Sequence, residues 1–149
     1  MSMDRPLTGG RPRAVNTAVL LREAFQTLND RVLTRLADSG HAAVRPAHGV
    51  VFQHLDDTGT TVSTLAERAQ MTKQAMAELV LHLERHGYVV REPDPADRRA
   101  KLVLPTGRGR EVVAIAQELV PAIEADVAGL IGAEGLDRLR ADLRAIIDG

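Results

Sequence analysis

The chain has 149 residues, which is enough for one domain with a hydrophobic core and too short for two ordinary domains. Hydrophobic residues make up 44% and charged residues 26% of the chain, as in globular proteins, and the lack of cysteine excludes disulfide bonds, thiolate zinc sites and cysteine catalysis. No apolar run approaches the roughly 20 residues that span a bilayer, and residues 1–13 hold no apolar signal-peptide stretch, so we expect a cytoplasmic protein without a membrane partner.

The net charge of −1 is unevenly distributed along the chain. Residues 68–110 hold nine basic and five acidic residues, whereas residues 111–149 hold three basic and eight acidic ones. A basic middle segment beside an acidic C-terminal third is typical of a protein in which one segment faces a polyanion. Chance clustering is the alternative at this point, because the differences are small.

The N-terminal third predicts a tail followed by two helices. Residues 1–13 contain four proline and glycine residues and are expected to form a flexible tail. Residues 14–36 carry an apolar residue at every third or fourth position, which predicts one amphipathic helix. A second helix is expected to begin near Pro46, which suits the first helical turn, and to end before the turn at residues 56–59.

The central segment predicts two short helices joined by a tight turn. Ser63 or Thr64 is expected to cap the first helix, at about residues 65–70, and Glu67 fits a capping box with Thr64. Thr72 is expected to cap the second helix, which Gly87 closes.

A β-hairpin is expected next. The β-prone segments 88–91 and 101–104 flank a polar stretch, residues 92–99, in which turn-forming and charged residues predominate. Two prolines stiffen this stretch, and its end carries two adjacent arginines. The pattern therefore predicts a protruding ribbon with a basic tip.

The C-terminal third predicts a long helix after Thr106, kinked at Pro121, and a final helix beyond Gly132. Ile146 and Ile147 lie within three residues of the C-terminus, where chain ends normally fray unless something buries them. We expect a second subunit to bury them in a homodimer. Closure of the last helix onto its own domain is the alternative.

The order helix, tight turn, helix and hairpin is typical of a winged helix-turn-helix, so the predicted fold class is mainly α with a small β-hairpin wing. One helix of such a fold enters the major groove of DNA, and its first residues reach base edges. Lys73 can contact guanine or a phosphate, Gln74 can form two hydrogen bonds with adenine, and Ala75 allows close approach or meets a thymine methyl group. An ordinary polar start of a surface helix is the alternative for these residues alone.

Arg98 and Arg99 strengthen the DNA-binding interpretation. An arginine on a stiff ribbon is well placed to enter a narrow minor groove, where negative potential is focused. Asp97 lies two residues before Arg99, so on a strand both side chains share one face and the carboxylate can hold the guanidinium. Alone, such a run is usually a solvated turn, but after the helix pair it favours DNA.

Several segments resemble motifs of the MarR (multiple-antibiotic-resistance regulator) family. They are Leu65–Arg68, Thr72–Ala75, Leu83–Val89, Asp94–Val103, and Thr106 with Gly109 and Arg110. The wing segment is the most specific, and the resemblance covers about residues 14–147. It implies a sequence-specific DNA-binding transcription regulator, usually a repressor, whose partner is an inverted repeat in double-stranded DNA.

The resemblance also implies a domain organisation. Family members are homodimers with interlocking terminal helices, so residues 14–149 are expected to form a single domain. Its DNA-binding lobe is expected at about residues 46–106, and its dimerisation helices at about residues 14–37 and 107–148.

By the same resemblance, Thr72 is expected to contact a phosphate and Arg99 to enter the minor groove. Arg98 is expected on a phosphate or as a substitute for Arg99, with Asp97 as the positioning residue. Pro105 stands where the family usually has leucine and is expected to fray the end of the wing strand, because it lacks a backbone donor. Glu78, on the recognition helix, is expected to point sideways or to read a cytosine.

Many relatives bind small aromatic or lipophilic molecules, often anionic, between the DNA-binding lobe and the dimerisation helices. Phe25, His48 and Phe52 are therefore candidates for ligand binding, with plain core positions as the alternative. His82 and His86 share a helical face at a spacing that can bind zinc, but no third ligand is evident, so neither a metal site nor a cofactor is predicted.

Other classes of function are less well supported. The sequence contains no glycine-rich phosphate loop, no nucleophile elbow and no HExxH motif, so enzyme activity is not expected. The alternative function is a winged-helix module that binds another protein. Glu78 favours it slightly, whereas Lys73, Gln74 and the two wing arginines favour DNA.

Overall fold

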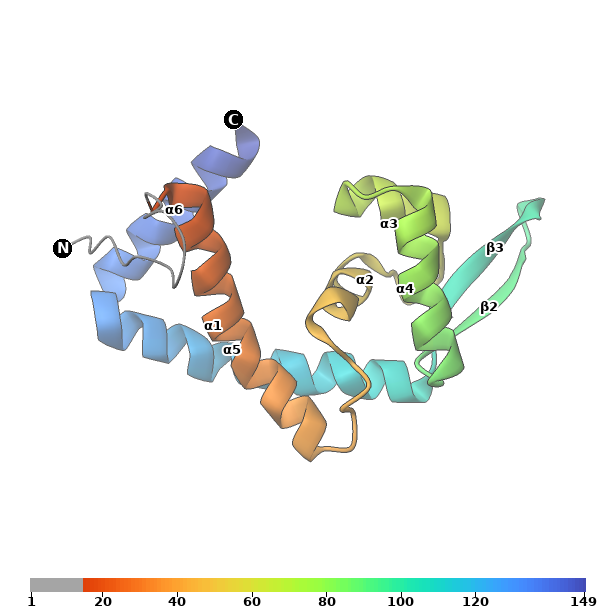
Figure 1. The fold of residues 1–149 in the computed structure, drawn as a ribbon, viewed down its shortest axis with the longest axis horizontal. Coiled ribbons are helices and arrows are strands. Elements are labelled where there is room, and N and C mark those ends of the chain that lie inside the picture. Colours follow the sequence, from red (N-terminus) through yellow and green to blue (C-terminus); the bar gives the residue numbers. More distant parts are fainter. Residues whose placement is uncertain (1–14) are drawn as a thin grey trace, which may run out of the picture.

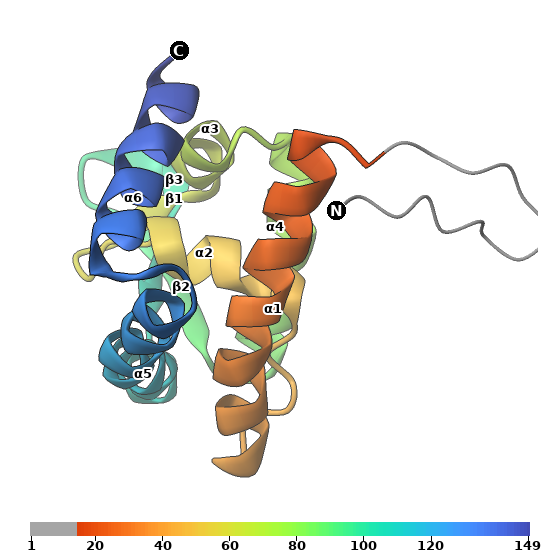
Figure 2. The same ribbon diagram turned by 90° about the vertical axis from the view of Figure 1, so that its left-hand side faces the viewer.

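The computed structural model describes residues 15–149, so the expected tail at residues 1–13 lies outside the described residues. Two lobes share one long helix (Figure 1). One lobe holds α1 (Thr17–Asp38) and α6 (Ala133–Asp148), and α5 (Gly107–Ile131) runs beneath both lobes and connects them. Figure 2, a quarter turn away, shows α1 and α6 as separate helices with α2 visible between them.

The second lobe contains the remaining elements. In chain order they are a short 3-10 helix (Pro46–His48), α2 (Gly49–His54), β1 (Thr60–Thr61), α3 (Val62–Ala69), α4 (Lys73–Arg85), β2 (Val89–Asp94) and β3 (Asp97–Pro105). The strands form an antiparallel sheet in the order β1-β3-β2. The predicted fold class, mainly α with a small wing, is confirmed.

The buried core lies in the second lobe and at its junction with α1 and α5. It consists of aliphatic side chains around one tyrosine, namely Leu36, Val44, Val51, Leu65, Ala66, Met76, Val80, Leu83, Tyr88, Val89, Val103 and Val112. By contrast, every residue of α6 and most of α1 is at least partly exposed. The apolar stripes of the terminal helices therefore lack a complete packing partner within one protomer.

The start of α3 differs from the prediction. Its N-cap is Thr61, whose Oγ1 accepts a hydrogen bond from the backbone N–H of Thr64 at 3.2 Å, so neither Ser63 nor Thr64 is the cap. The reason is a tertiary contact: Thr61 pairs with Leu102 of the wing, which holds it in the extended conformation that an N-cap needs.

The wing strands are also longer than predicted, since β2 continues to Asp94 and β3 begins at Asp97. Only two residues are left for the turn. Pro93 is tolerated because β2 is an edge strand, where a missing N–H faces solvent.

The expected fraying at Pro105 is wrong. Pro105 stays in register with Val89, and the next residue, Thr106, donates from its N–H to the carbonyl of Tyr88 at 3.1 Å. Strand β1 is too short to reach Pro105, because it pairs only with Leu102 and Val103. On the β1 side of β3, an N–H at position 105 would therefore have no strand partner, so the proline removes no hydrogen bond of the sheet there.

The C-terminal helices follow the prediction in outline. Helix α5 runs without interruption through Pro121, and Gly132, with a φ of 81°, separates it from α6. In the part of the chain that the structure describes, no helix combines the length and apolar character needed to cross a membrane.

Candidate nucleic-acid interface

The start of α4 is built as expected for a recognition helix. Thr72 is its N-cap, and its Oγ1 accepts a hydrogen bond from the N–H of Ala75 at 3.1 Å. Gln70 ends α3 in the left-handed conformation, with a φ of 54°, which keeps the turn between the helices tight. Lys73 and Gln74 are exposed at the first turn of α4, whereas the following Met76 is fully buried and anchors the helix.

Glu78 follows Gln74 by one helical turn, so these two residues share a face of α4. Ala75 and Glu78 line a cavity that they share with Phe25 and Asn29 of α1, and Glu78 itself is exposed. Lys73 and Gln74 form the exposed polar start of the helix, and the sideways or cytosine-reading position of Glu78 stays a prediction.

The wing tip is held by two backbone-directed aspartates. Oδ1 of Asp94 accepts from the N–H of Ala96 at 2.9 Å, and Oδ1 of Asp97 accepts from the N–H of Arg99 at 3.0 Å. We expected Asp97 to hold the guanidinium group of Arg99, but its carboxylate accepts a hydrogen bond from the backbone N–H of Arg99 instead. An aspartate side chain readily accepts from the N–H two residues later in the chain.

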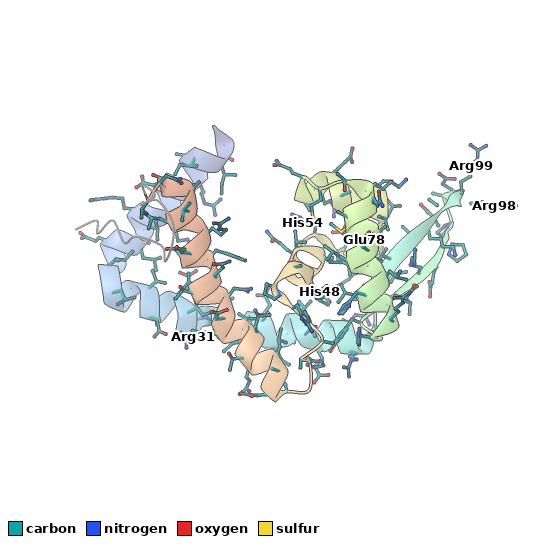
Figure 3. The ribbon with its side chains drawn as sticks, in the orientation of Figure 1. Arg31, His48, His54, Glu78, Arg98 and Arg99 are labelled. Atoms are coloured by element: carbon teal, nitrogen blue, oxygen red, sulfur yellow. The ribbon has the colours of Figure 1, made fainter. Side chains whose placement is uncertain are left out.

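The two arginines extend away from the body of the protein (Figure 3). Both are exposed, and within residues 15–149 neither takes part in a salt bridge. Their guanidinium groups are thus free to bind an external anion. The hydrogen bond between Asp97 and the backbone N–H of Arg99 stiffens the tip and leaves the charges of the two arginine side chains available.

An ion pair connects α4 to the wing. Nε of Arg91, on β2, donates to Oε2 of Glu84 at 3.2 Å, and its NH2 donates to Oε1 at 2.9 Å. These hydrogen bonds hold the pKa of Glu84 below its usual value. Two parallel bonds define an orientation as well as a distance. Sequence reasoning missed this pair, although its two members flank the turn at Gly87.

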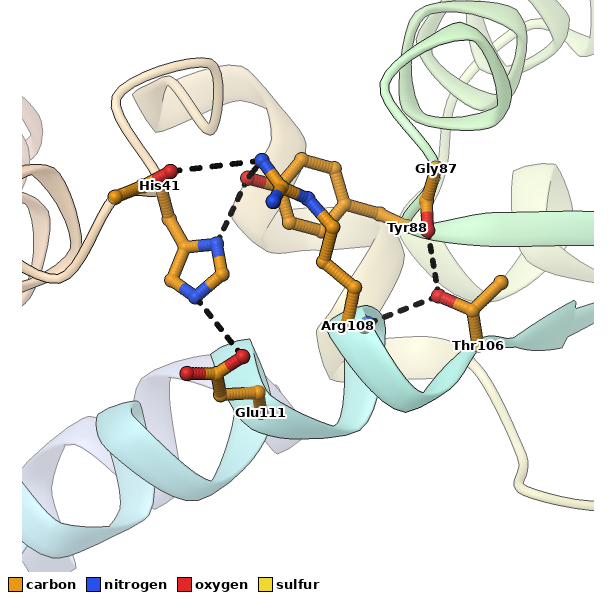
Figure 4. A network of polar contacts seen from close by, with 8 residues as sticks. His41, Gly87, Tyr88, Thr106, Arg108 and Glu111 are labelled. Atoms are coloured by element: carbon orange, nitrogen blue, oxygen red, sulfur yellow. Dashed lines mark hydrogen bonds and ion pairs between the residues drawn. The ribbon is translucent and has the colours of Figure 1, made fainter.

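A second missed cluster joins the wing, α1 and α5 (Figure 4). The hydroxyl of buried Tyr88 lies 2.9 Å from Nδ1 of His41 and accepts from Arg108 at 2.9 Å, while the Arg108 guanidinium covers the tyrosine ring. Nε2 of His41 lies 3.4 Å from a carboxylate oxygen of Glu111. The cluster ties the end of α1 to the base of the wing.

The start of α5 is packed closely against the same region. Thr106 donates from Oγ1 to the carbonyl of Gly87 at 2.6 Å and accepts from the N–H of Gly109 at 3.1 Å. A Cβ atom on Gly109 would overlap the carbonyl oxygen of Tyr88, so this position requires glycine. The resemblance had marked Thr106 and Gly109, but nothing in the local sequence indicated what they contact.

Comparison with known proteins decides the family. A sequence model of the MarR family matches residues 44–100. Transcriptional regulator HosA of Escherichia coli O127:H6 is 32% identical over 114 residues, which cover 76% of this chain and 82% of HosA. The chain belongs to the MarR family. It is a DNA-binding transcription regulator, as its family and its winged helix-turn-helix indicate.

Solved structures agree with the MarR fold. A MarR family regulator from Rhodococcus sp. RHA1 superposes with a TM-score of 0.66 at 25% identity, covering 87% of this chain and 90% of that one. MepR of Staphylococcus aureus, in a complex with DNA, superposes with a TM-score of 0.70 at 19% identity, covering 91% of this chain and 98% of MepR. At 19% identity, the similarity to MepR shows the fold alone.

The three candidate ligand residues of this MarR protein do not share a cavity. Phe25 is 61% exposed on α1 and lines the cavity with Glu78, whereas Phe52 lines a neighbouring one between α1, α2 and α5. His48 is only 5% exposed, and its ring stacks on that of His82 with centroids 4.1 Å apart. Its surroundings are those of a core histidine.

The histidines on α4 are likewise engaged in packing. The rings of His82 and His86 lie 4.4 Å apart, and Nε2 of His82 lies 2.9 Å from the carbonyl oxygen of Ala43. Within residues 15–149, no three histidine or acidic side chains are clustered as metal ligands would be.

Proposed function

We propose that this MarR protein represses transcription as a homodimer bound to an inverted repeat in duplex DNA. Each protomer inserts the start of α4 into the major groove and the wing tip into the adjacent minor groove. The observation that carries the proposal is the pairing of an exposed, capped Lys73-Gln74 helix start with free arginines on a stiffened ribbon of the same lobe. Repression is steric, since a bound dimer covers its operator.

The site residues have distinct roles. Gln74 pairs with adenine, and Lys73 binds guanine or a phosphate. Ala75 is half-buried and permits close approach of the helix to a thymine. Oγ1 of Thr72 accepts the capping bond, so its O–H remains available to donate to a phosphate oxygen.

On the wing, Arg99 enters the minor groove and Arg98 binds a phosphate. Asp97 keeps the backbone of Arg99 in place, which lowers the entropy that the tip loses on binding. The Arg91–Glu84 pair fixes the angle between wing and helix, so the two contacts are presented together.

The homodimer is supported by the exposed apolar surface of the terminal helices. Leu130 is 85% exposed at the end of α5, and Ile147 is 79% exposed on α6. Burial of such large apolar side chains against a partner is favourable. A two-fold axis through these helices would place two recognition helices about 34–36 Å apart, one turn of DNA.

Binding, orientation and electrostatics account for this function without a chemical step, and we propose no enzyme activity. Because the proposed partner is chromosomal DNA, we place the protein in the cytoplasm.

The experiment is selection of bound duplexes from a random pool, followed by a salt titration with the selected sequence. We expect an inverted repeat with half-sites one turn apart and an affinity that falls steeply with salt. Absence of any selected sequence, with no binding even at low salt, would contradict the proposal and favour a protein-binding module.

A variant tests the wing directly. Arg99→Ala should weaken binding to the selected duplex by about 1–3 kcal/mol, or roughly 5- to 150-fold, and leave the dimer intact. Arg35→Ala is the matched control, since Arg35 lies near the opposite end of the molecule, on α1, and its loss removes the same charge. Equal effects of the two substitutions would refute a specific role for the wing.

A further inference from the structure

A buried polar cluster connects α5 to the DNA-binding lobe at the base of the wing (Figure 4). Its members are His41, Tyr88, Arg108 and Glu111. Arg108 and Glu111 lie near the start of α5, the helix that the two lobes share. His41 lies in the loop after α1, and Tyr88 directly precedes β2. The cluster therefore spans the junction between the terminal helices and the lobe that holds α4 and the wing.

The hydrogen-bond donors and acceptors of the cluster fit together in one order. Arg108 can only donate, so the Tyr88 hydroxyl accepts from it at 2.9 Å and keeps its own proton to donate. Nδ1 of His41, 2.9 Å from that hydroxyl, accepts this proton, so the imidazole proton is placed on Nε2. Nε2 is buried without a hydrogen-bond partner within residues 15–149, but it lies 3.4 Å from the carboxylate of Glu111. The order of donation thus runs from one residue of α5, through the lobe, to another residue of α5.

These polar groups are costly to bury unless they stay together. His41 is only 2% exposed, and Tyr88 is fully buried. A buried polar group that loses its partner bears the full cost of leaving water, so the cluster resists any movement that separates its members. The apolar residues at the same junction, such as Leu36 and Val112, add packing that has no preferred direction. The polar cluster is therefore the part of the junction that fixes an angle.

A rotation at this junction would be amplified at the DNA-binding surface. Helix α4 has 13 residues and is about 20 Å long, with Lys73 at its start and its last turn bonded to the backbone of Tyr88. The Arg91–Glu84 pair ties the wing to α4, so both would move together. A rotation of about 10° would displace the start of the helix by about 3 Å, close to the rise of about 3.4 Å for one base pair.

We propose that this cluster determines which spacing between two half-sites the dimer accepts. Because the cluster holds α4 at one angle to α5 in each protomer, the distance between the two recognition helices is fixed. The proposal rests on the proposed function, a homodimer on an inverted repeat. The members of the cluster are positioning residues, since they act through α4 and the wing and not through contact with DNA.

The test lengthens or shortens the spacer of the selected inverted repeat by one base pair. This change shifts a half-site by about 3.4 Å and turns it by about 35°. A dimer with rigid junctions bears the mismatch as strain, so the unaltered protein should bind the altered duplexes at least about tenfold more weakly, as for a mismatched base pair. Tyr88→Phe keeps the buried ring but removes the central hydroxyl. Its spacing penalty should be about fivefold smaller, which is the effect of one hydrogen bond.

Two further variants complete the test. Arg108→Met removes the donor to Tyr88 and the cation over its ring from an exposed position, so the variant should fold and its spacing penalty should also fall. Thr60→Val is the matched control, since it removes another buried hydroxyl of the same lobe, one that accepts the N–H of Asp56 at 2.9 Å. The control should lose a similar amount of stability in urea and keep the full spacing penalty.

Base substitutions within a half-site report on direct contacts, and their penalties should be unchanged in all three variants. An unchanged spacing penalty in either Tyr88→Phe or Arg108→Met, or an equal fall in Thr60→Val, would overturn the role of the cluster while the proposed function stands. If the unaltered protein selects no inverted repeat or tolerates every spacing, the proposed function fails, and this proposal fails with it. The two failures are distinguished by whether the unaltered protein shows a spacing penalty.

Discussion

Acidification tests the buried histidine stack. His48 accepts a hydrogen bond at Nδ1 from the N–H of Arg45 at 2.9 Å, and its ring lies parallel to that of His82. Burial, and then the neighbouring His82, Arg45 and His86, lower the pKa of His48 from 6.5 to about 4. The folded protein thus binds the proton more weakly than the unfolded chain, and the difference has a direct consequence for stability.

The sign and size of the effect follow from that difference. Well above pH 6.5, His48 is neutral in both the folded and the unfolded protein, so it does not change the free energy of unfolding. As the pH falls from 6.5 towards 4, only the unfolded chain takes up the proton, so the free energy of unfolding decreases. At about 1.4 kcal/mol per pH unit, the loss is about 2 kcal/mol at pH 5 and about 3 kcal/mol below pH 4.

Urea unfolding at fixed protein concentration, between pH 7.5 and pH 5, measures this loss. His48→Asn is the reference variant, since an asparagine oxygen can accept the Arg45 N–H but does not titrate. The unaltered protein should lose about 2 kcal/mol more than the variant over this range. Parallel pH profiles would mean that His48 has the same pKa in the folded and the unfolded protein and would refute the argument.

Two further predictions concern packing and assembly. Gly109→Ala should lower the free energy of unfolding by more than about 2 kcal/mol, because the added methyl group overlaps the carbonyl oxygen of Tyr88. Gly107→Ala is the control and should cause no loss, since a methyl group there meets no atom within 4 Å. Calorimetric melting curves of the two variants measure the difference. Ile147→Asp should shift the protein towards monomer in sedimentation velocity and weaken binding to the inverted repeat; an unchanged dimer would show that α6 lies outside the interface.

The winged-helix lobe could be predicted from the sequence where its signals are local. Thr72 caps a helix with the N–H three residues later, and Gly87 supplies the left-handed turn, with a φ of 79°, that ends it. The cap of α3 was placed wrongly for the opposite reason. Thr61 is selected by pairing with Leu102, 41 positions away, and no local pattern reveals such a partner.

The candidate site likewise contains residues that local sequence signals predict and contacts that only the tertiary structure reveals. Lys73, Gln74 and the wing arginines follow from the order of elements, because exposure at a helix start or a hairpin tip needs no tertiary information. The contacts that orient them do need it. The pairing of Arg91 with Glu84, and the meeting of His41 with Tyr88, depend on how the elements pack.

The packing around α4 couples the two elements of the DNA-binding surface. The Arg91–Glu84 pair ties the end of α4 to β2, and the sheet registers β2 with β3, whose tip carries Arg99. Helix and wing are thus a single mechanical unit. On the proposed function, the major-groove and minor-groove contacts move together, because moving α4 alone would first have to break a bidentate ion pair.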